Sequence, residues 1–509
     1  NFLSINNFRN RVTPYGIISA SDNYPLDIDI KGVEYPQNTG INTLSFLNPW
    51  LANRSDDIIA VGEQYEGIGH ELISGPLADI YDGDYLQKYF RTWNIYKTDI
   101  DRHITEYDQP EYIIPEVIKN WPAGMMEYNG SMYEQADFVD LNQNNLYEPE
   151  RGEYPKISGD QAILYIVNNG RFPQANYHNY PTSDSLNIDM YVLVYAFDRP
   201  ESDIFQNTFF MKYKVINKSD IDYEDFRFGQ WLRINTNSNR YLGSDSLLNT
   251  FYFYPNSWYY SSYVDPDYTN HMECITFLNQ KMDKLTSTDA NTPYFGYIEK
   301  YNFMDGTWAD TLVSGNFPPD WIDKAPLNYC YPSNPSDPLG WSQITDDYDY
   351  NKSKKGDSGN RGVGTSGPHF LGEGEKLEFE LAFYINNSSD KGYFEFIDES
   401  LNNIEQLIEC YQNDSIPGGG SFTQIPENSI TPSSPIAQIY PNPAHTLLHI
   451  QTDYSDFDYY RIYSVYGQLV EERQFTKKID IEHLQDGFYL IQLLNGNGDA
   501  LVTRKFVKQ

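Results

Sequence analysis

A series of strand-like segments that begins at residue 161 constrains the fold of this chain more than any other feature. These segments are rich in Val, Ile, Tyr and Phe and either alternate with polar residues or stay apolar throughout, as half-buried and fully buried strands do. They cover residues 161–169, 190–198, 207–219, 226–235, 250–264, 292–303 and 376–386. The sequence therefore predicts a mainly β protein whose main body is a β-sandwich with a few helices.

Two segments have helical signals. Residues 115–121 (PEVIKNW) are predicted to form a short helix, and apolar side chains recur at helical spacing between Ile397 and Ile408. Asp398 and Glu399 lie in the first turn of this second helix, where acidic side chains interact favourably with the helix dipole. Residues 85–104 combine helical and extended signals, so both structures are compatible with them.

The composition changes after the second helix. Residues 413–435 contain Gly, Ser, Pro and Asn without periodic apolar positions, which is typical of a linker. We therefore divide the chain into an N-terminal mixed region (1–160), a β-rich main domain that ends in a helix (161–412), the linker, and a C-terminal domain (436–509).

The chain is strongly acidic, with 36 Lys and Arg residues against 72 Asp and Glu residues and a net charge of −36. This charge disfavours nucleic acids and anionic membrane surfaces as partners. It suits solubility outside a cell, cation binding or contact with neutral polymers such as glycans. The 45 tyrosines fit half-exposed strands and would also allow stacking against sugars.

Cysteine is rare, since Cys274, Cys330 and Cys410 permit at most one disulfide. Whether Cys274 and Cys330 pair is open, and Cys410 is expected to be a buried thiol near the end of the second helix. No apolar run reaches the ~18 residues that span a membrane. Because the chain starts at Asn1, we expect a mature protein whose signal peptide has been removed.

Residues 436–509 divide into seven short strands, which is enough for a small antiparallel β-sandwich. Gly467 and Gly487 lie between strands, where turns need a conformationally permissive residue. Four motifs follow one another: YPNPAHTLLHI, RIYSVYGQLV, IDIEHLQDGFYLIQL and TRKFVKQ.

Together these motifs resemble the type A C-terminal sorting domain of the type IX secretion system. In that family a Pro-Asn-Pro motif, a glycine-centred strand–turn–strand, a hairpin and a Lys-rich last strand occur in this order. The resemblance assigns the sorting signal to Pro441, Asn442, Pro443, Gly467, Gly487, Lys505 and Lys508.

The resemblance implies export across the inner membrane by a cleaved signal and passage through the outer-membrane translocon. An outer-membrane shuttle protein would recognise residues 436–509, and the tail would commonly be removed. The protein is then expected at the cell surface or outside the cell. An ordinary adhesive β-sandwich is the alternative interpretation of this domain.

The segment 137–161 contains the best candidate for a binding site in the main body. Asp140, Asn142 and Asn144 alternate, as ligands do in calcium loops, because calcium takes about six to eight hard oxygen ligands from a tightly curled loop. The carbonyl of Leu146 would be the backbone ligand, and Glu148 or Glu150 would follow. Glu153, with Asp137 and Asp160, could complete the shell.

Two positions depart from the usual calcium loop, because Asn145 replaces the turn glycine and Arg151 replaces the glutamate at position twelve. We predict a structural calcium site with the ligands Asp140, Asn142, Asn144, Leu146, Glu150 and Glu153. A surface loop whose Asn and Asp side chains cap its own turns is the alternative. The segment also resembles one in large secreted bacterial surface proteins that carry the same sorting domain, a resemblance that implies no activity.

We assign no catalytic residues. The eight histidines form no HExxH or other close metal-binding pair, and residues 364–368 (GTSGP) lack the final glycine of a nucleophile elbow. We therefore expect a non-catalytic exported protein: an adhesin, a surface-layer or filament subunit, or a module that contacts surface polysaccharide. The alternative is a secreted glycan-active hydrolase or lyase that uses an Asp/Glu pair.

Overall fold

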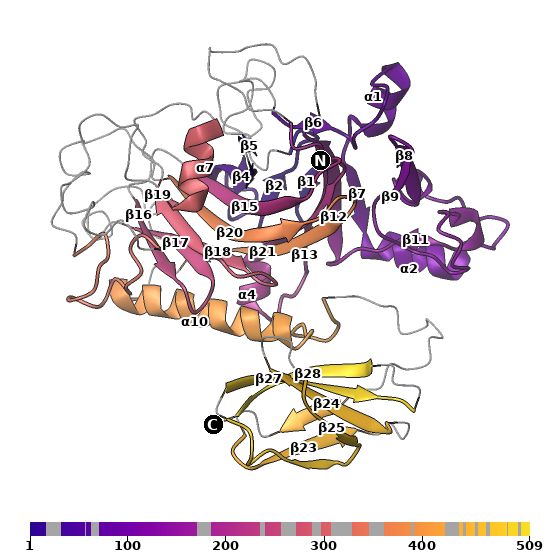
Figure 1. The fold of residues 1–509 in the computed structure, drawn as a ribbon. Helices are drawn as coiled ribbons and strands as arrows, with labels where there is room; N and C mark the ends of the chain where they lie inside the picture. The colour runs from indigo at the N-terminus through magenta and orange to yellow at the C-terminus, as the bar shows by residue number, and fades with distance from the viewer. Residues whose placement is uncertain are drawn as a thin grey trace, which may run out of the picture. The chain divides into compact units, whose positions relative to one another are not determined.

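Figure 1 shows a computed structural model of the chain. It describes residues 1–16, 32–55, 57–62, 71–170, 185–234, 240–255, 271–287, 297–306, 328–345, 361–387, 391–422, 437–440, 444–452, 457–464, 469–485, 487–496 and 500–508. These residues form two compact units, one within residues 1–424 and one within residues 425–509.

Two antiparallel sheets form the centre of the first unit (Figure 1). In its described part, an eight-stranded sheet runs in the order β1 (Phe2–Leu3), β2 (Arg9–Arg11), β3 (Val33–Glu34), β4 (Asn42–Arg54), β15 (Tyr223–Ile234), β20 (Arg361–Leu371) and β19 (Lys284–Ser287), with β5 (Ile58–Gly62) also paired to β4. A nine-stranded sheet runs in the order β16 (Arg240–Asp245), β17 (Thr250–Pro255), β18 (His271–Phe277), β21 (Lys376–Asn387), β14 (Thr208–Asn217), β13 (Ile188–Ala196), β12 (Gln161–Asn168) and β6 (Ile73–Ser74), with β7 (Trp93–Tyr96) also paired to β12.

The main hydrophobic core lies between the two sheets. Alternate side chains of β12, β13 and β14 point into it, as Val192, Val194 and Met211 do, and they meet Leu47 and Phe228 from the eight-stranded sheet. The side chains between them on each strand point to the outer face of the nine-stranded sheet, because the side-chain period of a strand is two. That outer face is also covered, so these strands are apolar on both faces, as the continuous apolar runs indicate.

Helices and short elements cover the outer faces of both sheets. Helix α7 (Tyr297–Asp305) packs Tyr301 and Met304 against Trp50 and Trp231 of the eight-stranded sheet, and the two indole rings stack with centroids 5.5 Å apart. The nine-stranded sheet is covered by two groups of elements. One is helix α10 (Tyr393–Gln412), and the other comprises α1 (Gly83–Tyr89), α2 (Lys97–Glu106), α3 (Glu116–Lys119), β8 (Met125–Tyr128), β9 (Ser131–Glu134), β10 (Phe138–Val139), the 3-10 turn Pro149–Arg151 and β11 (Tyr154–Pro155).

A short segment joins the two sheets at one open side of the sandwich. Leu285 of β19 donates its N–H to the carbonyl of Asn328 (2.8 Å) and accepts from the N–H of Cys330 (3.1 Å). Ser244 of β16 donates to the carbonyl of Tyr331 (3.1 Å). Residues 328–331 therefore satisfy backbone groups on the edge strands of both sheets, which protects these edges from pairing with other chains.

The second unit is a small sandwich, as the sequence predicts. A three-stranded sheet contains β22 (Ala437–Tyr440), β23 (Leu447–Thr452) and β26 (Lys478–Asp480). A four-stranded sheet contains β25 (Leu469–Gln474), β24 (Tyr459–Ser464), β27 (Gly487–Leu494) and β28 (Ala500–Lys508). Leu448, Ile450, Ile462, Ile491 and Phe506 form its core.

The mainly β fold is confirmed, as are the helix predicted at 115–121 (α3) and the helix predicted between Ile397 and Ile408 (α10). Because α10 begins at Tyr393, its first turn contains Glu395, and the expectation that Asp398 and Glu399 lie there is wrong. The strand prediction for 292–303 is wrong where the structure describes it, because residues 297–305 form α7. Short apolar runs do not distinguish strand from helix, and here Tyr301 and Met304, three positions apart, face the same side of a helix. The predicted boundary at residue 160 matches no division between compact units, since β1–β4 share a sheet with β15 and β20.

The predicted linker begins later than residue 413. Ile416 and Phe422 are buried in the core beneath the outer face of the nine-stranded sheet, and the ring of Phe422 lies against those of Phe197 and Tyr411. Cys274 and Cys330 are free and belong to the cores on opposite faces of the nine-stranded sheet, so they cannot pair. Cys410 is half-buried and not fully buried. No helix in the described part of the chain is both long and apolar enough to span a membrane.

Candidate functional site

The predicted calcium loop lies between β10 and the turn Pro149–Arg151 and curls around the carboxylate of Asp140. One carboxylate oxygen accepts from the backbone N–H groups of Gln143 (2.7 Å) and Asn144 (3.3 Å), and the other accepts from that of Asn145 (2.7 Å). Burial acts to raise the pKa of Asp140, but these backbone donors hold it below its ordinary value. Asn145 has a φ of 61°, so it adopts the left-handed conformation for which calcium loops use glycine.

Glu153 and Glu148 complete this loop. The Glu153 side chain is buried and accepts from the backbone N–H groups of Leu141 (3.2 Å) and Glu148 (2.7 Å). Burial raises the pKa of Glu153, and the charges of Asp140 and Glu148 raise it further. Glu148 accepts from the amide nitrogens of Asn142 (2.9 Å) and Asn144 (2.8 Å).

The structure thus brings five of the six predicted calcium ligands together in one hydrogen-bonded loop. They are Asp140, Asn142, Asn144, Leu146 and Glu153. Glu150 lies in the exposed turn Pro149–Arg151, and Glu148 takes its place in the hydrogen-bonded loop. In the described part of the chain no three His, Cys, Asp or Glu side chains converge closely enough to hold a metal ion. A calcium ion here would therefore depend on amide and backbone oxygens as well as on carboxylates.

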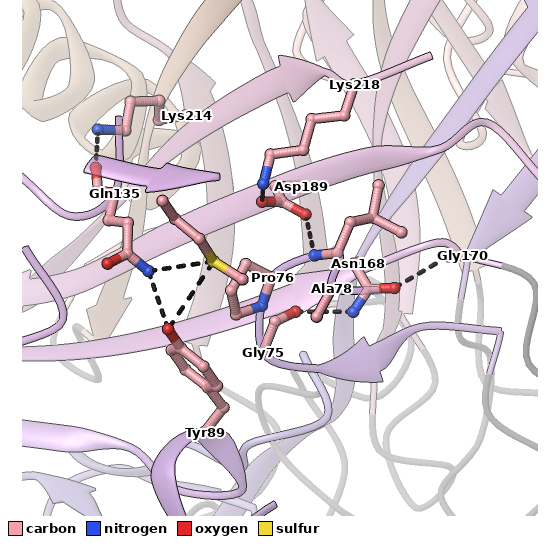
Figure 2. Close-up of polar contacts among 12 residues, drawn as sticks. Gly75, Pro76, Ala78, Tyr89, Gln135, Asn168, Gly170, Asp189, Lys214 and Lys218 are labelled. Carbon is pink, nitrogen blue, oxygen red and sulfur yellow. Dashed lines mark hydrogen bonds and ion pairs between the residues drawn. The ribbon is translucent and has the colours of Figure 1, made fainter. Parts of the chain in front are cut away.

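A second polar cluster, at residues for which no site was predicted, lies on the outer face of the nine-stranded sheet (Figure 2). Asp189 of β13 forms an ion pair with Lys218, which follows β14, at 2.5 Å, and both side chains are 0% exposed. The other carboxylate oxygen of Asp189 accepts from the backbone N–H of Leu77 at 2.6 Å. The rings of Tyr133 and Tyr128 lie 4.8 and 5.5 Å from the ammonium nitrogen.

Burial raises the pKa of Asp189 to about 6, although the attraction of Lys218 acts in the opposite direction. Asn168, opposite Asp189 on β12, donates to the carbonyl of Gly75 (2.8 Å) and accepts from the N–H of Gly170 (2.9 Å). The cluster therefore fixes the segment 75–77 against the sheet (Figure 2).

Lys214 extends this cluster along β14. Its ammonium group donates to the carbonyl of Gln135 and to the carboxylate of Asp137, both at 2.6 Å. Gln135 in turn donates to the hydroxyl of Tyr89 at 3.0 Å. Burial acts to raise the pKa of Asp137, but Lys214 holds it below its ordinary value. These contacts join the sheet to helix α1 and to the segment after β9.

Two carboxylates on β21 form a third candidate site on the same outer face. Glu380 accepts from the hydroxyl groups of Tyr195 (2.5 Å) and Tyr411 (2.7 Å), and Glu378 forms an ion pair with Lys212 at 3.1 Å. Glu378 and Glu380 are two positions apart on one strand, so their backbones are separated by about 7 Å. Glycosidases use two carboxyl groups about 5–10 Å apart, so two glutamates on one face of a strand are a candidate pair for that chemistry.

Ser366 and His369 are also in contact, with the hydroxyl oxygen 2.9 Å from the ring Nε2. Ser366 lies in β20 and is 0% exposed, which leaves its hydroxyl without access to a substrate. Asp283 bonds to the backbone N–H of Gly367 at 3.0 Å. Because the serine is buried and His369 is only partly buried, the pair is a packing contact and not a nucleophile with its base.

Several of the sorting-signal residues predicted from the sequence lie outside the described residues: Pro441, Asn442 and Pro443, and Gly467. The side chain of Lys505 is also outside them. Gly487 begins β27 with a φ of 157° and pairs with Lys508 of β28, whose side chain is mostly buried. The hairpin predicted for the end of the domain is therefore present.

The polar cluster around Asp189 had one signal in the sequence. Asp189 interrupts an otherwise apolar strand, and Lys212, Lys214 and Lys218 alternate along the next strand and past its end. Charged residues at such positions are buried only when they are paired. Which acid meets which lysine depends on the strand register, and the sequence pattern does not specify it.

Comparison with known proteins identifies the C-terminal unit. Residues 438–509 match the family model described as the secretion system C-terminal sorting domain. No curated protein matches the sequence. Among solved structures, a polysaccharide lyase matches at 7% identity with a TM-score of 0.21, covering 76% of this chain and 40% of the lyase.

A mutant heparan sulfate lyase from Pedobacter heparinus matches at 10% identity with a TM-score of 0.20, covering 64% of this chain and 27% of the lyase. The chain therefore spans less than half of the length of either lyase. At these TM-scores the likeness carries no information about the activity of residues 1–424.

Proposed function

Residues 438–509 are a type IX sorting domain, which directs this protein to the cell surface or the extracellular space, and we propose that residues 1–424 act there as a non-catalytic surface module. Such a module would be an adhesin, a surface-layer or filament subunit, or a protein that contacts polysaccharide. The translocon and the outer-membrane shuttle protein are the expected partners of the tail.

The observation that carries this proposal is that the described charged clusters of the body connect layers of the fold. The Asp189–Lys218 pair joins two strands to the segment 75–77. Lys300 of α7 bonds to Glu71 at 2.6 Å, and Glu71 also accepts from the N–H of Gly62 at the end of β5. Groups engaged in this way stabilise a rigid scaffold, whereas catalytic acids and bases must be free to exchange protons with a substrate.

Exposed apolar side chains are frequent in one stretch of the chain. Within the described residues, many of those that are large and exposed lie between positions 80 and 146, namely Ile80, Leu86, Phe90, Tyr96, Tyr107, Ile113, Met125, Met132, Leu141 and Leu146. Apolar and aromatic side chains on an acidic surface suit a neutral polymer or another copy of the protein better than a polyanion.

The proposal is tested on material shed or stripped from the cell surface. Electron microscopy of this fraction is expected to show either ordered polymers, as for a layer or filament subunit, or single particles. In the second case the particles are expected to bind insoluble surface polysaccharide in a sedimentation assay. Single particles that bind no polysaccharide and no cells would contradict the proposed role.

A glycan-active hydrolase or lyase is the second candidate, and Glu378 and Glu380 are the observation that favours it. If residues 1–424 are non-catalytic, the purified protein leaves a panel of neutral and acidic polysaccharides at their original chain length, as measured by size-exclusion chromatography. Chain shortening that is lost in Glu380→Gln and retained in Glu134→Gln, an exposed control, would establish the enzyme instead. An amide in place of the carboxylate removes the proton-transfer group while keeping its shape.

We also propose that the loop 140–153 binds calcium as a structural ligand. The buried carboxylate of Glu153 lies near Asp140 and Glu148, and these charges destabilise one another in the absence of a cation. Oxygen donors of this kind are the ligands that calcium prefers, and an extracellular destination would supply the ion at millimolar concentration.

Calcium is therefore expected to raise the melting temperature of the protein by several degrees. A ligand present at 100 times its dissociation constant stabilises the folded state by about 2.7 kcal/mol. Asp140→Ala should abolish the shift, whereas Glu127→Gln, an exposed acid on β8, should retain it. Identical melting curves with calcium and with EGTA would contradict the site, and differential scanning fluorimetry suffices for the measurement.

A further inference from the structure

The ion pair between Lys218 and Asp189 has an unusual set of partners. The ammonium nitrogen lies 2.5 Å from one carboxylate oxygen, and both side chains are 0% exposed. Among the described residues, no further hydrogen-bonding partner is found for that nitrogen or for that oxygen. An ammonium group has three N–H donors, so this cation is buried with a single polar neighbour and two tyrosine rings.

Burial of a charge with so few partners is costly, because each ion loses its hydration and regains little in return. The second oxygen of the carboxylate does have a hydrogen-bond donor, since the backbone N–H of Leu77 donates to it at 2.6 Å. The geometry therefore presents one oxygen that is held by a donor and another that faces only the amine (Figure 2).

We propose that Lys218 and Asp189 condense to form an intramolecular amide between the side-chain nitrogen of the lysine and the carboxyl carbon of the aspartate. The ammonium group first transfers a proton to the carboxylate, which gives a neutral amine and a carboxylic acid. The amine lone pair attacks the carboxyl carbon and forms the new C–N bond. The bond from that carbon to the oxygen that faced Lys218 then breaks, and this oxygen leaves as water with both protons supplied by the lysine nitrogen.

The step is balanced by the two side chains themselves, since an ammonium group and a carboxylate yield one amide and one water without an oxidant or a reductant. The 2.5 Å contact between the amine nitrogen and a carboxylate oxygen holds the nitrogen beside the carboxyl carbon, which replaces a bimolecular encounter by an intramolecular one. The N–H of Leu77 is placed to stabilise the negative charge that develops on the other oxygen during attack. In the product, the same N–H donates to the amide carbonyl.

The environment favours the neutral form of the carboxyl group. Burial raises the pKa of Asp189 to about 6, which brings the protonated carboxyl group, the electrophile of this step, within reach near neutral pH. Tyr128 and Tyr133 surround the lysine nitrogen with aromatic rings. Condensation would remove both charges from this environment.

Other ion pairs in the described part of the chain do not combine a buried lysine, a buried carboxylate and the lack of a second acceptor for the amine. Lys214 is buried, but its carboxylate partner Asp137 is 38% exposed and its ammonium group has a second acceptor in the Gln135 carbonyl. The pair Lys376–Glu134 is exposed on both sides. Arg240 and Glu273 are buried together, but a guanidinium group stays protonated and is not a nucleophile.

The amide would link β13 to the residue that follows β14, beside the segment 75–77. The described cysteines are free, so a covalent link of this kind would supply the described body with a cross-link that reducing agents do not open. The inference concerns covalent structure and does not rest on the proposed function.

Intact-mass spectrometry of the denatured full chain tests the proposal. The wild-type protein is expected to be lighter than its sequence mass by one water molecule, and a digest should yield a branched peptide that joins the segments containing Asp189 and Lys218. Lys218→Arg and Asp189→Ala should each restore the full mass for their sequences, whereas Lys214→Arg should keep the deficit.

A loss of water could also arise from cyclisation of an aspartate onto its own backbone, and the variants distinguish the two. A deficit that persists in Lys218→Arg would be such a cyclic imide and would overturn the proposal. A wild-type mass equal to the sequence mass would overturn it as well, leaving Lys218 and Asp189 as an ion pair. Because mass is measured on denatured protein, the wild-type result does not depend on the folding of the variants.

Discussion

Deletion of residues 436–509 is expected to leave the protein in the periplasm. The deleted segment contains the whole β-sandwich from β22 to β28 and the residues that match the sorting-domain family, so a translocon that recognises this fold has nothing left to bind. The surface signal should fall to the level of cells that lack the gene, as measured by immunolabelling of intact cells and by fractionation.

The body should remain folded in this variant, because residues 1–424 are a compact unit with their own cores. Protease resistance of the periplasmic protein provides that control. The converse fusion, residues 425–509 joined to a periplasmic reporter, should bring the reporter to the surface. Continued surface display of the truncated protein would show that sorting does not depend on the tail.

Replacement of Asp189 by Ala is expected to lower the free energy of unfolding of the body by about 3–5 kcal/mol, because it leaves the ammonium group of Lys218 buried without a counter-ion. The Leu77 N–H loses its acceptor in the same variant. Chemical denaturation followed by tryptophan fluorescence measures the change. Glu134→Ala is the matched control, because it breaks the exposed pair with Lys376 and should cost only about 0–1 kcal/mol.

The double variant Asp189→Ala, Lys218→Met separates an ion pair from an amide. If the native link is only an ion pair, removal of both charges should recover most of the stability lost in the single variant. If it is an amide, the double variant also loses a covalent loop of about 30 residues, whose closure contributes about 3–4 kcal/mol by the relation used for disulfides. Stability of the double variant close to the wild-type value would therefore speak against the amide.

The pH dependence of the free energy of unfolding also distinguishes an ion pair from an amide. A free Asp189 carboxyl group has a folded-state pKa of about 6, above the value of about 3.9 in an unfolded chain. It binds its proton more tightly in the folded state, so its contribution to stability is fully present below about pH 4 and is lost as the pH rises through about 6. The stability difference between wild type and Asp189→Ala should narrow over this range for a free carboxyl group and stay constant for an amide.

Periodicity predicted most of the secondary structure correctly where the apolar pattern was long. The runs at 161–169, 190–198 and 376–386 became β12, β13 and β21, because strands that are buried on both faces leave a continuous apolar signature. The pattern was ambiguous at 297–305, because the helix is short and its aromatic residues are equally typical of a strand. Composition also failed to predict the domain boundary, because β1–β4 share a sheet with β15, β19 and β20, which are more than a hundred residues away in the chain.

The candidate sites also differ in whether a local sequence pattern predicts them. The alternation of Asp140, Asn142 and Asn144 is local, so the sequence indicated one loop, and the structure shows those side chains accepting backbone hydrogen bonds within it. The Glu378 and Glu380 pair was hidden among 72 acidic residues, and it becomes distinctive only when Tyr195 and Tyr411 are seen to donate to one of its members.

The sequence by itself determined the export route, the mainly β class and the small C-terminal sandwich, because these follow from patterns of neighbouring residues. Only the tertiary structure decided that Asp189 meets Lys218 away from water. The register Asp189↔Ile216 places Lys218 diagonally opposite Asp189 on the same face of the sheet, and the segments 75–77 and 125–134 then cover that face. Burial depends on all of these elements at once, and it is burial that converts an ordinary pair of charged residues into a reactive one.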